Sequence, residues 1–475
     1  MRSTWHAALA GSLALSAACA SLDGRESFSD VQEVVQARTG KVVRWDQGTK
    51  ADEEAAEALS ALLAQPLTAD AAVQVALLSN PALQATLERV GVAQADLVEA
   101  GLLQNPWFAS TVLLVEGQAQ PEFAFSVALD FLDVIYLPLR VSIAESDLEA
   151  TKAAVTAEVL DLAFEARTAF YAHQAALERL DVIEDLAEAQ DAALDLARRL
   201  HAAGNLSDLD LFNVEALWQD EQLALLDARA EVKRTRERVN VLLGLWGRRT
   251  EWSAVPTLPN IPDEPVPVGD VERRALTESL DLVAAKRSIE AAAARLGYSR
   301  TTRFIPELEA GFQVENEEGP WKAGPSVVVP LPLLNWGQAD VARREAELRL
   351  AQKAFVAEAI RVRAAARLVE TNLEAARARV LRLRDEVLPL QARIAAETLR
   401  EYNAMLVGLF QLLAARRMEL EAAGRYADAR LDYWTARAAL DQLLSGRLPP
   451  EGGLEGAGAP PTTSTRGSGR AQQGH

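Results

Sequence analysis

Few residues in this 475-residue chain have the types and spacing that catalysis requires. The sequence contains one cysteine, Cys19, and only three histidines beyond the N-terminal segment, His173, His201 and His475. It has no HExxH motif, no Cys–His cluster, no glycine-rich phosphate loop and no nucleophile elbow. Its 68 acidic residues are most simply explained as solvated helix faces. We therefore expect no enzymatic activity, no cofactor and no metal site.

Cys19 is the residue whose surroundings point most clearly to a chemical event. Residues 1–18 resemble a signal peptide, in which Arg2 precedes an apolar run that ends in small residues. Residues 15–19, Leu-Ser-Ala-Ala-Cys, resemble a bacterial lipobox, in which cleavage before the cysteine leaves its thiol to be lipidated. The alternative is an ordinary secretory signal followed by an incidental cysteine. The mature chain has no second cysteine, so it can form neither an internal disulfide nor a thiolate metal cluster.

The net charge argues against a nucleic-acid partner, and the hydropathy argues against a transmembrane helix. The formal net charge is -19, whereas nucleic-acid binding needs a basic surface, so we expect no nucleic-acid partner. No run of 18 apolar residues follows the N-terminal segment, and a transmembrane helix is therefore not expected. If the chain spans a membrane, it must do so as part of a closed β-barrel.

Two stretches without glycine or proline dominate the chain, at residues 139–203 and 339–388. Their composition favours helix at nearly every position. At about 1.5 Å per residue they would reach roughly 100 and 75 Å, far beyond an ordinary globular helix. Apolar residues in the first stretch recur every three or four positions, the spacing of a helix that packs against neighbours. Leu137-Pro138 precedes that helix.

Capping residues and helix breakers predict the shorter helices. A helical stretch lies near residues 51–64, and the rest of residues 20–66 is weakly patterned. Thr68 is the expected N-cap of the next helix, which Asn80-Pro81 interrupts before a second helix runs to about Leu103. Ser207 is the expected cap of a helix from Asp208 to about Leu243, which Gly244 closes.

The chain is an internal duplication. Residues 270–282 align with 71–83 at an offset of 199, and residues 402–416 align without gaps with 201–215 at an offset of 201. Each half has the order helix, strand, strand, long helix, turn, long helix. The predicted parts are a signal peptide (1–18), an N-terminal lipidated segment (19–66), a first repeat (67–252), a Pro-rich linker (253–269), a second repeat (270–445) and a disordered tail (446–475).

Four short segments are predicted strands. They are residues 107–115, 123–131, 308–315 and 327–329, and the second alternates strictly between apolar and small or polar residues. The longer ones have about nine residues, the length that a tilted strand needs to cross a bilayer. Because four strands cannot close a barrel, their edges must pair with other copies, and three copies would supply about twelve strands.

We expect one face of these strands to meet lipid and the other to face a water-filled lumen. The predicted lipid face carries Phe123, Phe125, Val127, Leu129, Phe312 and Val314. Glu309, Gln313 and Glu315 alternate with apolar residues and are predicted to face the lumen, the alternative being an exposed sheet face.

This arrangement resembles the TolC family of outer-membrane efflux channels from about Leu67 to Leu444. The resemblance is carried by residues 67–68 (Leu-Thr) through 80–83 (Asn-Pro-Ala-Leu), by 329–333 (Val-Pro-Leu-Pro-Leu) with 335–337 (Asn-Trp-Gly), and by 402–413 (Tyr-Asn-Ala-Met-Leu-Val-Gly-Leu-Phe-Gln-Leu-Leu). No one of these is diagnostic, but their order, spacing and duplication together are specific.

The resemblance implies an α+β membrane protein that assembles as a homotrimer in the outer membrane. Tandem-duplicated long helical hairpins would form a periplasmic α-barrel, and four strands per protomer would form a trimeric twelve-stranded transmembrane β-barrel. The implied partners are a periplasmic adaptor (membrane fusion) protein, an inner-membrane pump and outer-membrane lipid. The lipobox-like Cys19 suggests the lipid-anchored branch of the family, which includes channels for drugs and for heavy-metal cations.

The resemblance also implies that the two helix–turn–helix tips close the tunnel and meet the adaptor. The matching tip residues are Gly204, Asn205 and Leu206 in the first half and Met405, Leu406, Val407 and Gly408 in the second. Several relatives carry acidic residues in the second tip, where this chain has Gln411 and Ala414. Asp208 and Asp210 of the first tip are candidates to supply negative charge instead, the alternative being helix capping.

The leading hypothesis is therefore a passive export duct, which needs a polar lumen and a gate but no catalytic residue. The first alternative is a periplasmic coiled-coil adaptor or scaffold of an export complex. An adaptor needs a β-rich domain split around one hairpin, whereas this chain has two hairpins and short amphipathic strands. A soluble scaffold or an enzyme of unknown type is the second alternative, and dependence on detergent separates both from a channel.

Overall fold

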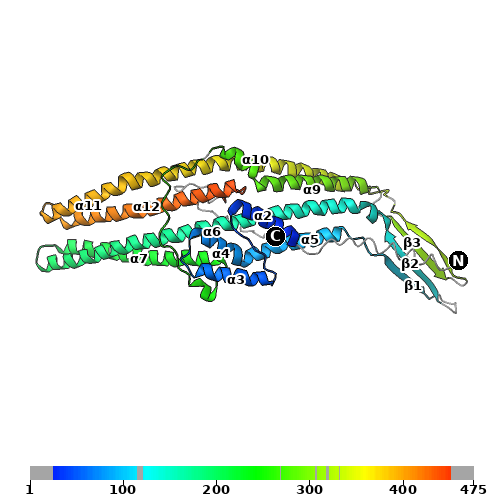
Figure 1. The fold of residues 1–475 in the computed structure, drawn as a ribbon, viewed down its shortest axis with the longest axis horizontal. Coiled ribbons are helices and arrows are strands. Elements are labelled where there is room, and N and C mark those ends of the chain that lie inside the picture. Colours follow the sequence, from blue (N-terminus) through cyan, green and yellow to red (C-terminus); the bar gives the residue numbers. More distant parts are fainter. Residues whose placement is uncertain are drawn as a thin grey trace, which may run out of the picture. The chain divides into compact units, whose positions relative to one another are not determined.

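A computed structural model describes residues 25–114, 121–267, 269–304, 308–316, 320–330 and 332–450 (Figure 1). The predicted signal peptide, Cys19, the turn before Pro121 and the tail beyond residue 450 lie outside these residues. Two helices, α2 (Arg25–Thr39) and α3 (Lys50–Leu63), precede the duplicated part of the chain. The second of them confirms the helix predicted near residues 51–64.

The order of elements confirms the predicted duplication. The first half contains α4 (Ala69–Ser79), α5 (Pro81–Ala100), β1 (Trp107–Leu113), β2 (Glu122–Asp130), α6 (Phe131–Ala202) and α7 (Asp208–Leu243), followed by the short η1 (Gly247–Thr250). The second half contains α8 (Val271–Glu278), α9 (Leu280–Thr302), β3 (Glu309–Asn316), β4 (Lys322–Val328), α10 (Gln338–Arg382), η2 (Leu383–Val387), α11 (Leu388–Asn403) and α12 (Leu409–Leu444).

Contacts divide the chain into two compact units, and each unit draws on both halves. Unit 1 comprises Met1–Gln47, Pro81–Val159 and Leu280–Arg361. Unit 2 comprises Gly48–Asn80, Leu160–Ser279 and Val362–His475. The long helices α6 and α10 each contribute residues to both units, so the structural units do not coincide with the sequence repeats.

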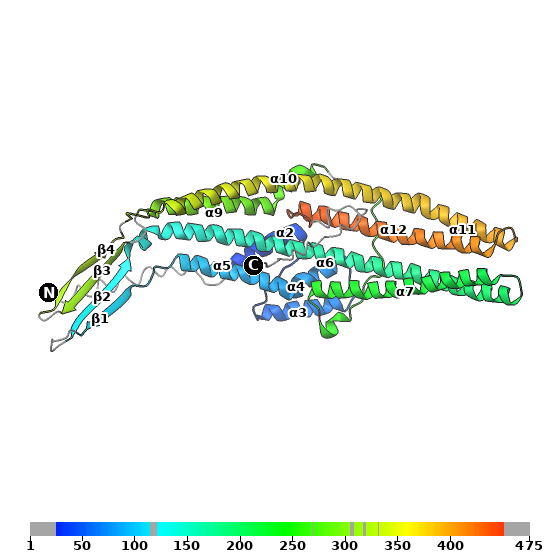
Figure 2. The same ribbon diagram turned by 180° about the vertical axis from the view of Figure 1, so that it is seen from behind.

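Unit 1 contains one four-stranded antiparallel sheet with the strand order β1-β2-β3-β4 (Figure 2). The central pairing, between β2 and β3, joins the two halves of the chain, with Phe125 opposite Val314 and Ser126 opposite Gln313. The edge strand β4 starts at Lys322 and includes Pro325, whereas the sequence predicts a strand only at residues 327–329. Proline is tolerated there because β4 is an edge strand.

The transition from β2 to α6 lies earlier than the sequence predicts. Phe131 is predicted as the last strand residue, but its backbone N–H donates to the Leu308 carbonyl (2.9 Å) and begins α6. The Asp130 carboxylate caps this helix by accepting from the backbone N–H of Leu132 (3.0 Å), and it also accepts from that of Leu308 (3.2 Å). Pro138 therefore lies inside α6 and does not mark its start.

Three further boundaries differ from the sequence prediction. The helix α5 ends at Ala100 rather than near Leu103, and β1 ends at Leu113, with Val115 outside the described residues. Helix α2 is not predicted at all, although Phe28, Val31 and Val35 bury one face of it at helical spacing. The low apolar content around these three residues hides the pattern.

The long helix predicted at residues 339–388 is present, but it does not end there. At η2 the helix widens to a π-type turn, in which the Leu388 backbone N–H donates to the Leu383 carbonyl. Pro389, directly after it, has no N–H to donate, and one wide turn lets the chain stay helical past such a residue. The helix then continues to Asn403 as α11.

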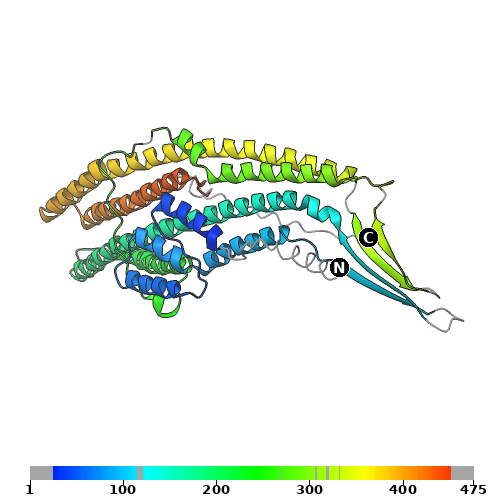
Figure 3. The same ribbon diagram turned by 45° about the vertical axis from the view of Figure 1, so that its right-hand side comes forward.

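Unit 2 contains two helical hairpins, which Figure 3 shows as the green pair α6–α7 and the orange pair α11–α12. The predicted bounds of α7 are confirmed: Ser207 caps it, and Gly244 ends it with φ +67°. The predicted linker is irregular, and its backbone pairs with Leu67 through two hydrogen bonds, to Ser253 and Val255. Arg447 pairs with Asp161, so the packed chain extends beyond residue 446, where the tail is predicted to begin.

Across the described ranges, every helix is either too short or too polar to cross a membrane.

A buried aromatic cluster closes the end of the first repeat in unit 2. Trp252 packs against Phe170 and against the His173 ring, and its indole N–H donates to the Asn240 side chain (2.7 Å). His173 is only 1% exposed. Burial lowers the pKa of this imidazole from 6.5 to about 4, and the positive charge of Arg236 lowers it further in the same direction. The ring is therefore neutral in the folded protein near neutral pH.

We expect His173 to make the protein sensitive to acid. Because its folded pKa is depressed, its contribution to stability is complete above pH 6.5 and is lost as the pH falls from there through about 4. A shift of this size corresponds to roughly 3 kcal/mol. The unfolding temperature of the detergent-solubilised protein should fall more steeply between pH 7 and 4 in the wild type than in His173→Gln, whose amide does not titrate. Parallel curves would show that the imidazole does not contribute.

Candidate functional site

The first hairpin tip is a tight turn between α6 and α7. Gly204 lies in the left-handed region, with φ +75°. The backbone N–H of Asn205 donates to the Leu200 carbonyl (2.8 Å), which closes the end of α6. Ser207 then caps α7 by accepting from the backbone N–H of Asp210 (3.1 Å), and its hydroxyl donates to the Asp210 carboxylate (2.7 Å). The predicted tip residues thus form one capped turn.

The second tip repeats this geometry with different residues. Met405 takes the place of Gly204 and has φ +60°, a conformation that costs a residue with a side chain about 1–2 kcal/mol. The backbone N–H of Leu406 donates to the Glu401 carbonyl (2.9 Å), as Asn205 does in the first tip. Gly408 is the N-cap, and its backbone N–H donates to the Gln411 side-chain oxygen (3.0 Å). Gln411 is thereby engaged in capping.

The two acidic residues of the first tip have different surroundings. Asp210 takes part in the capping interaction with Ser207. Asp208 is exposed, and its carboxylate lies 2.6 Å from the ring nitrogen Nε2 of His201. His201, at the end of α6, is a tip residue that the sequence does not single out, although its position seven residues before Asp208 places both at the turn. The capping alternative therefore applies to Asp210, while Asp208 bridges the two helices.

An apolar cluster in unit 2 joins the two tips. Its buried members are Leu194, Ala197 and Val214 of the first hairpin and Leu409 of the second. The outer surface of the tips, in contrast, exposes large apolar side chains. These are Leu209 and Phe212 on α7, and Met405 and Leu406 in the second turn, with Met405 93% exposed. Each tip thus presents large apolar side chains to solvent, which favours an interaction surface there.

The register of the sheet places the predicted residues on two opposite faces. Residues that are paired across neighbouring strands share a face, and successive residues along a strand alternate. One face carries Phe123, Phe125, Val127, Leu129, Phe312 and Val314, and the other carries Glu309, Gln313 and Glu315. Phe125 lies at the centre of the apolar face, where its ring stacks with Phe108 at 6.3 Å and with Trp321 at 6.1 Å between centroids.

Gly311 fixes the pairing of β2 with β3. It lies opposite Ala128, and a side-chain β-carbon at this position would be 2.5 Å from the Val127 carbonyl oxygen and 2.6 Å from the Ala128 β-carbon. The two backbones therefore approach too closely for any residue except glycine. Gly324 in β4 has no neighbour within 4 Å of such a carbon. The two glycines of the sheet thus have different roles.

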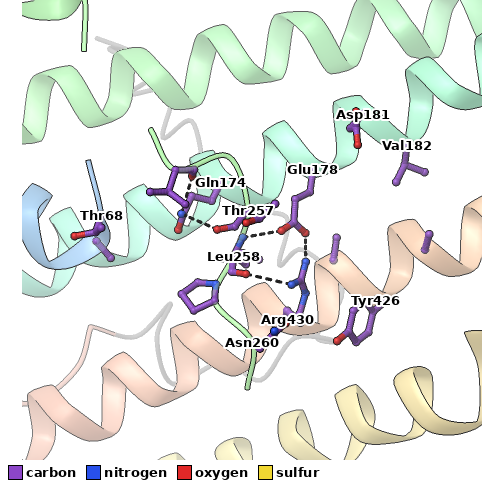
Figure 4. A pocket seen from close by; sticks show the side chains of 15 residues that line it. Thr68, Gln174, Glu178, Asp181, Val182, Thr257, Leu258, Asn260, Tyr426 and Arg430 are labelled. Carbon is purple, nitrogen blue, oxygen red and sulfur yellow. Dashed lines mark hydrogen bonds and ion pairs between the residues drawn. The ribbon is translucent and has the colours of Figure 1, made fainter. Parts of the chain in front are cut away.

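A buried ion pair in unit 2 holds the linker against two helices (Figure 4). Glu178 of α6 and Arg430 of α12 form the pair, and both side chains are largely buried. Glu178 accepts from the backbone N–H of Leu258 (2.6 Å), and Arg430 donates to the Leu258 carbonyl (3.2 Å). Gln174 donates to the carbonyls of Val255 and Thr257, both at 2.9 Å.

The Glu178–Arg430 ion pair and Gln174 border a cavity of about 730 Å³. Thr68, Asp181, Asn260 and Tyr426 also line this cavity. The Arg430 guanidinium lies over the Tyr426 ring, 4.9 Å from its centroid. Glu178 and Arg430 are therefore paired with each other and with the linker backbone. Among the described residues, no three His, Cys, Asp or Glu side chains are grouped so that they could hold a metal ion.

Comparison with known proteins identifies relatives of this chain. Residues 72–245 match the family described as outer membrane efflux protein. The chain is 23% identical over 400 residues to the cobalt-zinc-cadmium resistance protein CzcC of Cupriavidus metallidurans, an alignment that covers 80% of this chain and 90% of that protein.

Solved structures with the same fold are outer-membrane proteins. The outer membrane protein VceC of Vibrio cholerae matches with a TM-score of 0.65 and 17% identity, over 83% of this chain and 97% of that one. The CmeC outer membrane channel of Campylobacter jejuni matches with a TM-score of 0.66 and 14% identity, over 80% and 86%. At these identities the structural likeness establishes the fold alone.

We expect Gly311→Ala to disrupt the sheet. The added carbon would force β2 and β3 apart, a form of overpacking that costs typically about 1–3 kcal/mol. Thermal unfolding of the detergent-solubilised protein, followed by the β-sheet signal in infrared spectra, should shift to lower temperature. The matched control is Gly324→Ala in the same sheet, which should unfold like the wild type. Equal unfolding temperatures for the two variants would contradict the close approach at Gly311.

Met405→Gly should stabilise the second tip. Glycine adopts the left-handed conformation without a steric penalty, which we expect to favour the folded turn by about 1 kcal/mol. Hydrogen exchange of the backbone amides at residues 404–408 should become slower by several-fold. Gly204→Ala is the reciprocal variant and should accelerate exchange in the first tip. Faster exchange in Met405→Gly would show that the methionine side chain stabilises the turn.

Proposed function

We propose that this chain, which belongs to the outer membrane efflux protein family, forms the outer-membrane channel of a tripartite export system. The observation that carries this proposal is the amphipathic sheet in unit 1. One face is apolar and the other carries carboxylate and amide side chains, as a strand between lipid and a water-filled lumen requires. In this proposal the long paired helices form the wall of a tunnel. A passive duct of this kind needs no catalytic residue.

A trimer would complete the sheet. Within the described residues, β1 and β4 each have only one neighbouring strand, so the sheet has two open edges. Pairing β4 of one copy with β1 of the next closes a barrel of about twelve strands from three copies. The helices also expose apolar side chains that sister copies would cover, including Leu223 and Leu226 on α7 and Leu350 and Ile360 on α10.

In this assembly the face around Phe125 and Phe312 meets outer-membrane lipid, and Glu309, Gln313 and Glu315 line the lumen. The helical tunnel extends into the periplasm. Lipidation of Cys19 would anchor the N-terminus to the same membrane. The two repeats and the linker expected from the sequence are the parts of each protomer in this assembly. Each compact unit contains segments of both repeats.

The hairpin tips form the entrance and the docking surface for the adaptor, which in turn contacts the inner-membrane pump. The exposed side chains of Phe212, Met405 and Leu406 fit the apolar face of a helical partner. Docking would also give a reason for a methionine at φ +60°, because backbone strain is typically kept where a function needs it. Asp208 would add negative charge at this entrance.

Divalent metal cations are the proposed substrates. The metal-resistance role in the name of the CzcC relative favours them, and the net charge of -19 suits a lumen that cations cross. Drugs or other small solutes are the second candidate, since a passive duct need not recognise what it carries. The family match does not favour an adaptor or scaffold.

Arginine substitutions on the two sheet faces test this function. Phe125→Arg should reduce trimer yield in the outer membrane, because an arginine that faces lipid costs roughly 2–4 kcal/mol at mid-depth. Gln313→Arg, on the opposite face, should assemble like the wild type. Trimer yield is measured by mass analysis of the detergent extract. Tolerance of cobalt, zinc and cadmium is measured in a strain that lacks the native gene and carries each variant.

The wild type should restore metal tolerance, and Phe125→Arg should not. Gln313→Arg adds a positive charge to the proposed lumen, so it is the control for trimer yield alone. A protein that is extracted without detergent as a monomer would refute the channel. If the wild-type protein forms trimers but does not raise the metal tolerance of the strain that lacks the gene, the metal substrate is refuted. The channel proposal would still stand.

A further inference from the structure

The turn that follows α7 in unit 2 directs a tryptophan into solvent. The chain leaves α7 at Gly244 and Leu245 is buried, whereas the next residue, Trp246, is 77% exposed. It is the most exposed tryptophan among the described residues. Trp252, farther along the same segment, lies in the core and is 3% exposed. Figure 1 shows this turn in green, projecting below α7. The local core is therefore complete without Trp246.

Hydrogen bonds hold this turn against α7. The Trp246 carbonyl accepts from the backbone N–H of Arg249 (3.3 Å), which forms the short η1 helix. The Arg236 guanidinium of α7 donates to the Thr250 carbonyl (2.8 Å) and lies over the Trp252 ring, 4.4 Å from its centroid. The outward side chains of the turn are therefore presented on an ordered backbone.

The surroundings of Trp246 are basic, although the chain as a whole is acidic. Residues 231–251 contain six arginine or lysine residues and three glutamates, whereas the net charge of the chain is -19. Arg238, Arg248 and Arg249 are exposed, and none of the three forms an ion pair within the described residues. Arg234 of the same helix, in contrast, pairs with a glutamate one turn before it. Positive charge is thus left for a partner at this end of α7.

We call Arg238, Val241, Trp246, Arg248 and Arg249 the Trp246 patch. Arg238 and Val241 share a face of α7, because residues three apart are neighbours on a helix, and Val241 is 74% exposed. Tryptophan and arginine are the residue types that most often dominate the binding energy of an interface. Unpaired guanidinium groups around an exposed aromatic ring indicate a partner that carries negative charge and also offers an apolar face.

A glycan that carries carboxylates combines these two properties. The C–H face of a sugar ring can pack on an aromatic ring, and carboxylates accept paired hydrogen bonds from arginine. In the proposed assembly the helical tunnel extends into the periplasm, and peptidoglycan is the polymer of this chemistry in that compartment. A trimer has three copies of the patch, so a repeating polymer can engage several at once, and contacts that are weak singly then add up.

We propose that the Trp246 patch binds the anionic glycan of the peptidoglycan layer. In this interaction Arg238, Arg248 and Arg249 pair with carboxylates of the polymer, and Trp246 packs on a sugar ring. The inference rests on the proposed channel function, because that function places the helices of unit 2 in the periplasm. It adds that the protein is attached to the cell wall as well as to the membrane.

Sedimentation with purified peptidoglycan sacculi tests the patch. The detergent-solubilised full chain is mixed with increasing amounts of sacculi, which are pelleted, and the bound fraction is measured. Trp246→Ala, and Arg248→Glu combined with Arg249→Glu, should each raise the amount of sacculi needed for half-maximal binding by about tenfold. Trp246→Tyr keeps a flat ring and should bind like the wild type. Binding by the wild type should weaken as the salt concentration rises, because salt screens exposed charges.

The matched control reverses two other neighbouring arginines of unit 2. Arg273→Glu combined with Arg274→Glu makes the same change in net charge on α8, where both residues are exposed. This control should bind sacculi like the wild type. An equal loss of binding in the control would show that only the total charge matters, and it would overturn the patch. Unimpaired binding by the patch variants would overturn it as well.

Two further solid ligands separate an anionic glycan from its component features. Chitin has N-acetylated sugar rings without carboxylates, and carboxylate-coated beads have negative charge without sugar rings. The wild type should bind both less tightly than sacculi. Chitin binding as tight as sacculus binding would overturn the role of the carboxylates. Equally tight binding to the beads would show a general anion surface, such as one for an acidic protein, and would overturn the glycan.

A sister copy is the alternative cover of the patch, because α7 also exposes Leu223 and Leu226. Cys19 is the only cysteine, so Trp246→Cys in a Cys19→Ala background gives a single thiol. A polar maleimide should label this thiol in intact trimers. A thiol that is protected in trimers, together with a lower trimer yield of the patch variants, would assign the patch to the seam between protomers and overturn the glycan. The channel would still stand in that case, because detergent extraction and trimer yield test it separately.

Discussion

The antiparallel pairing of β2 with β3 is the interaction on which the rest of the structure depends. It is the only strand pairing between the two halves of the chain in the described sheet, and it sets which side chains share a face. A slip of one strand by one residue would move all of its apolar side chains to the opposite face. Gly311 and the Asp130 carboxylate hold this register, the first by close backbone approach and the second by binding the Leu132 and Leu308 amides.

The two halves reach the same shapes with different residues. Gly204 and Met405 occupy matching positions of the two turns, and both have a left-handed backbone. One turn ends in a serine cap and the other in a glycine whose amide binds Gln411. The backbone hydrogen bonds that end the first helix of each hairpin are the same in both tips, so the duplicated backbone is retained while the side chains differ.

Buried polar contacts hold the linker in place. Glu178 and Arg430 come from the first and second halves, and both bind the backbone of Leu258 in the segment that connects those halves. Removing either charge would leave the other buried without its partner, which is costly. The linker is therefore packed into unit 2 as a structural element, although its proline-rich sequence is irregular.

The sequence by itself determined the duplication, the long helices, the capped turns and the alternation of the strands, because these depend on local propensity and periodicity. The start of α6 at Phe131 and the full length of β4 depended on tertiary structure, since Leu308 and β3 supply the partners that extend these elements. The pairing of Asp208 with His201 and the capping by Gln411 were also decided there. Sequence spacing identifies which residues reach a turn, but only the folded backbone determines which acceptor each donor meets.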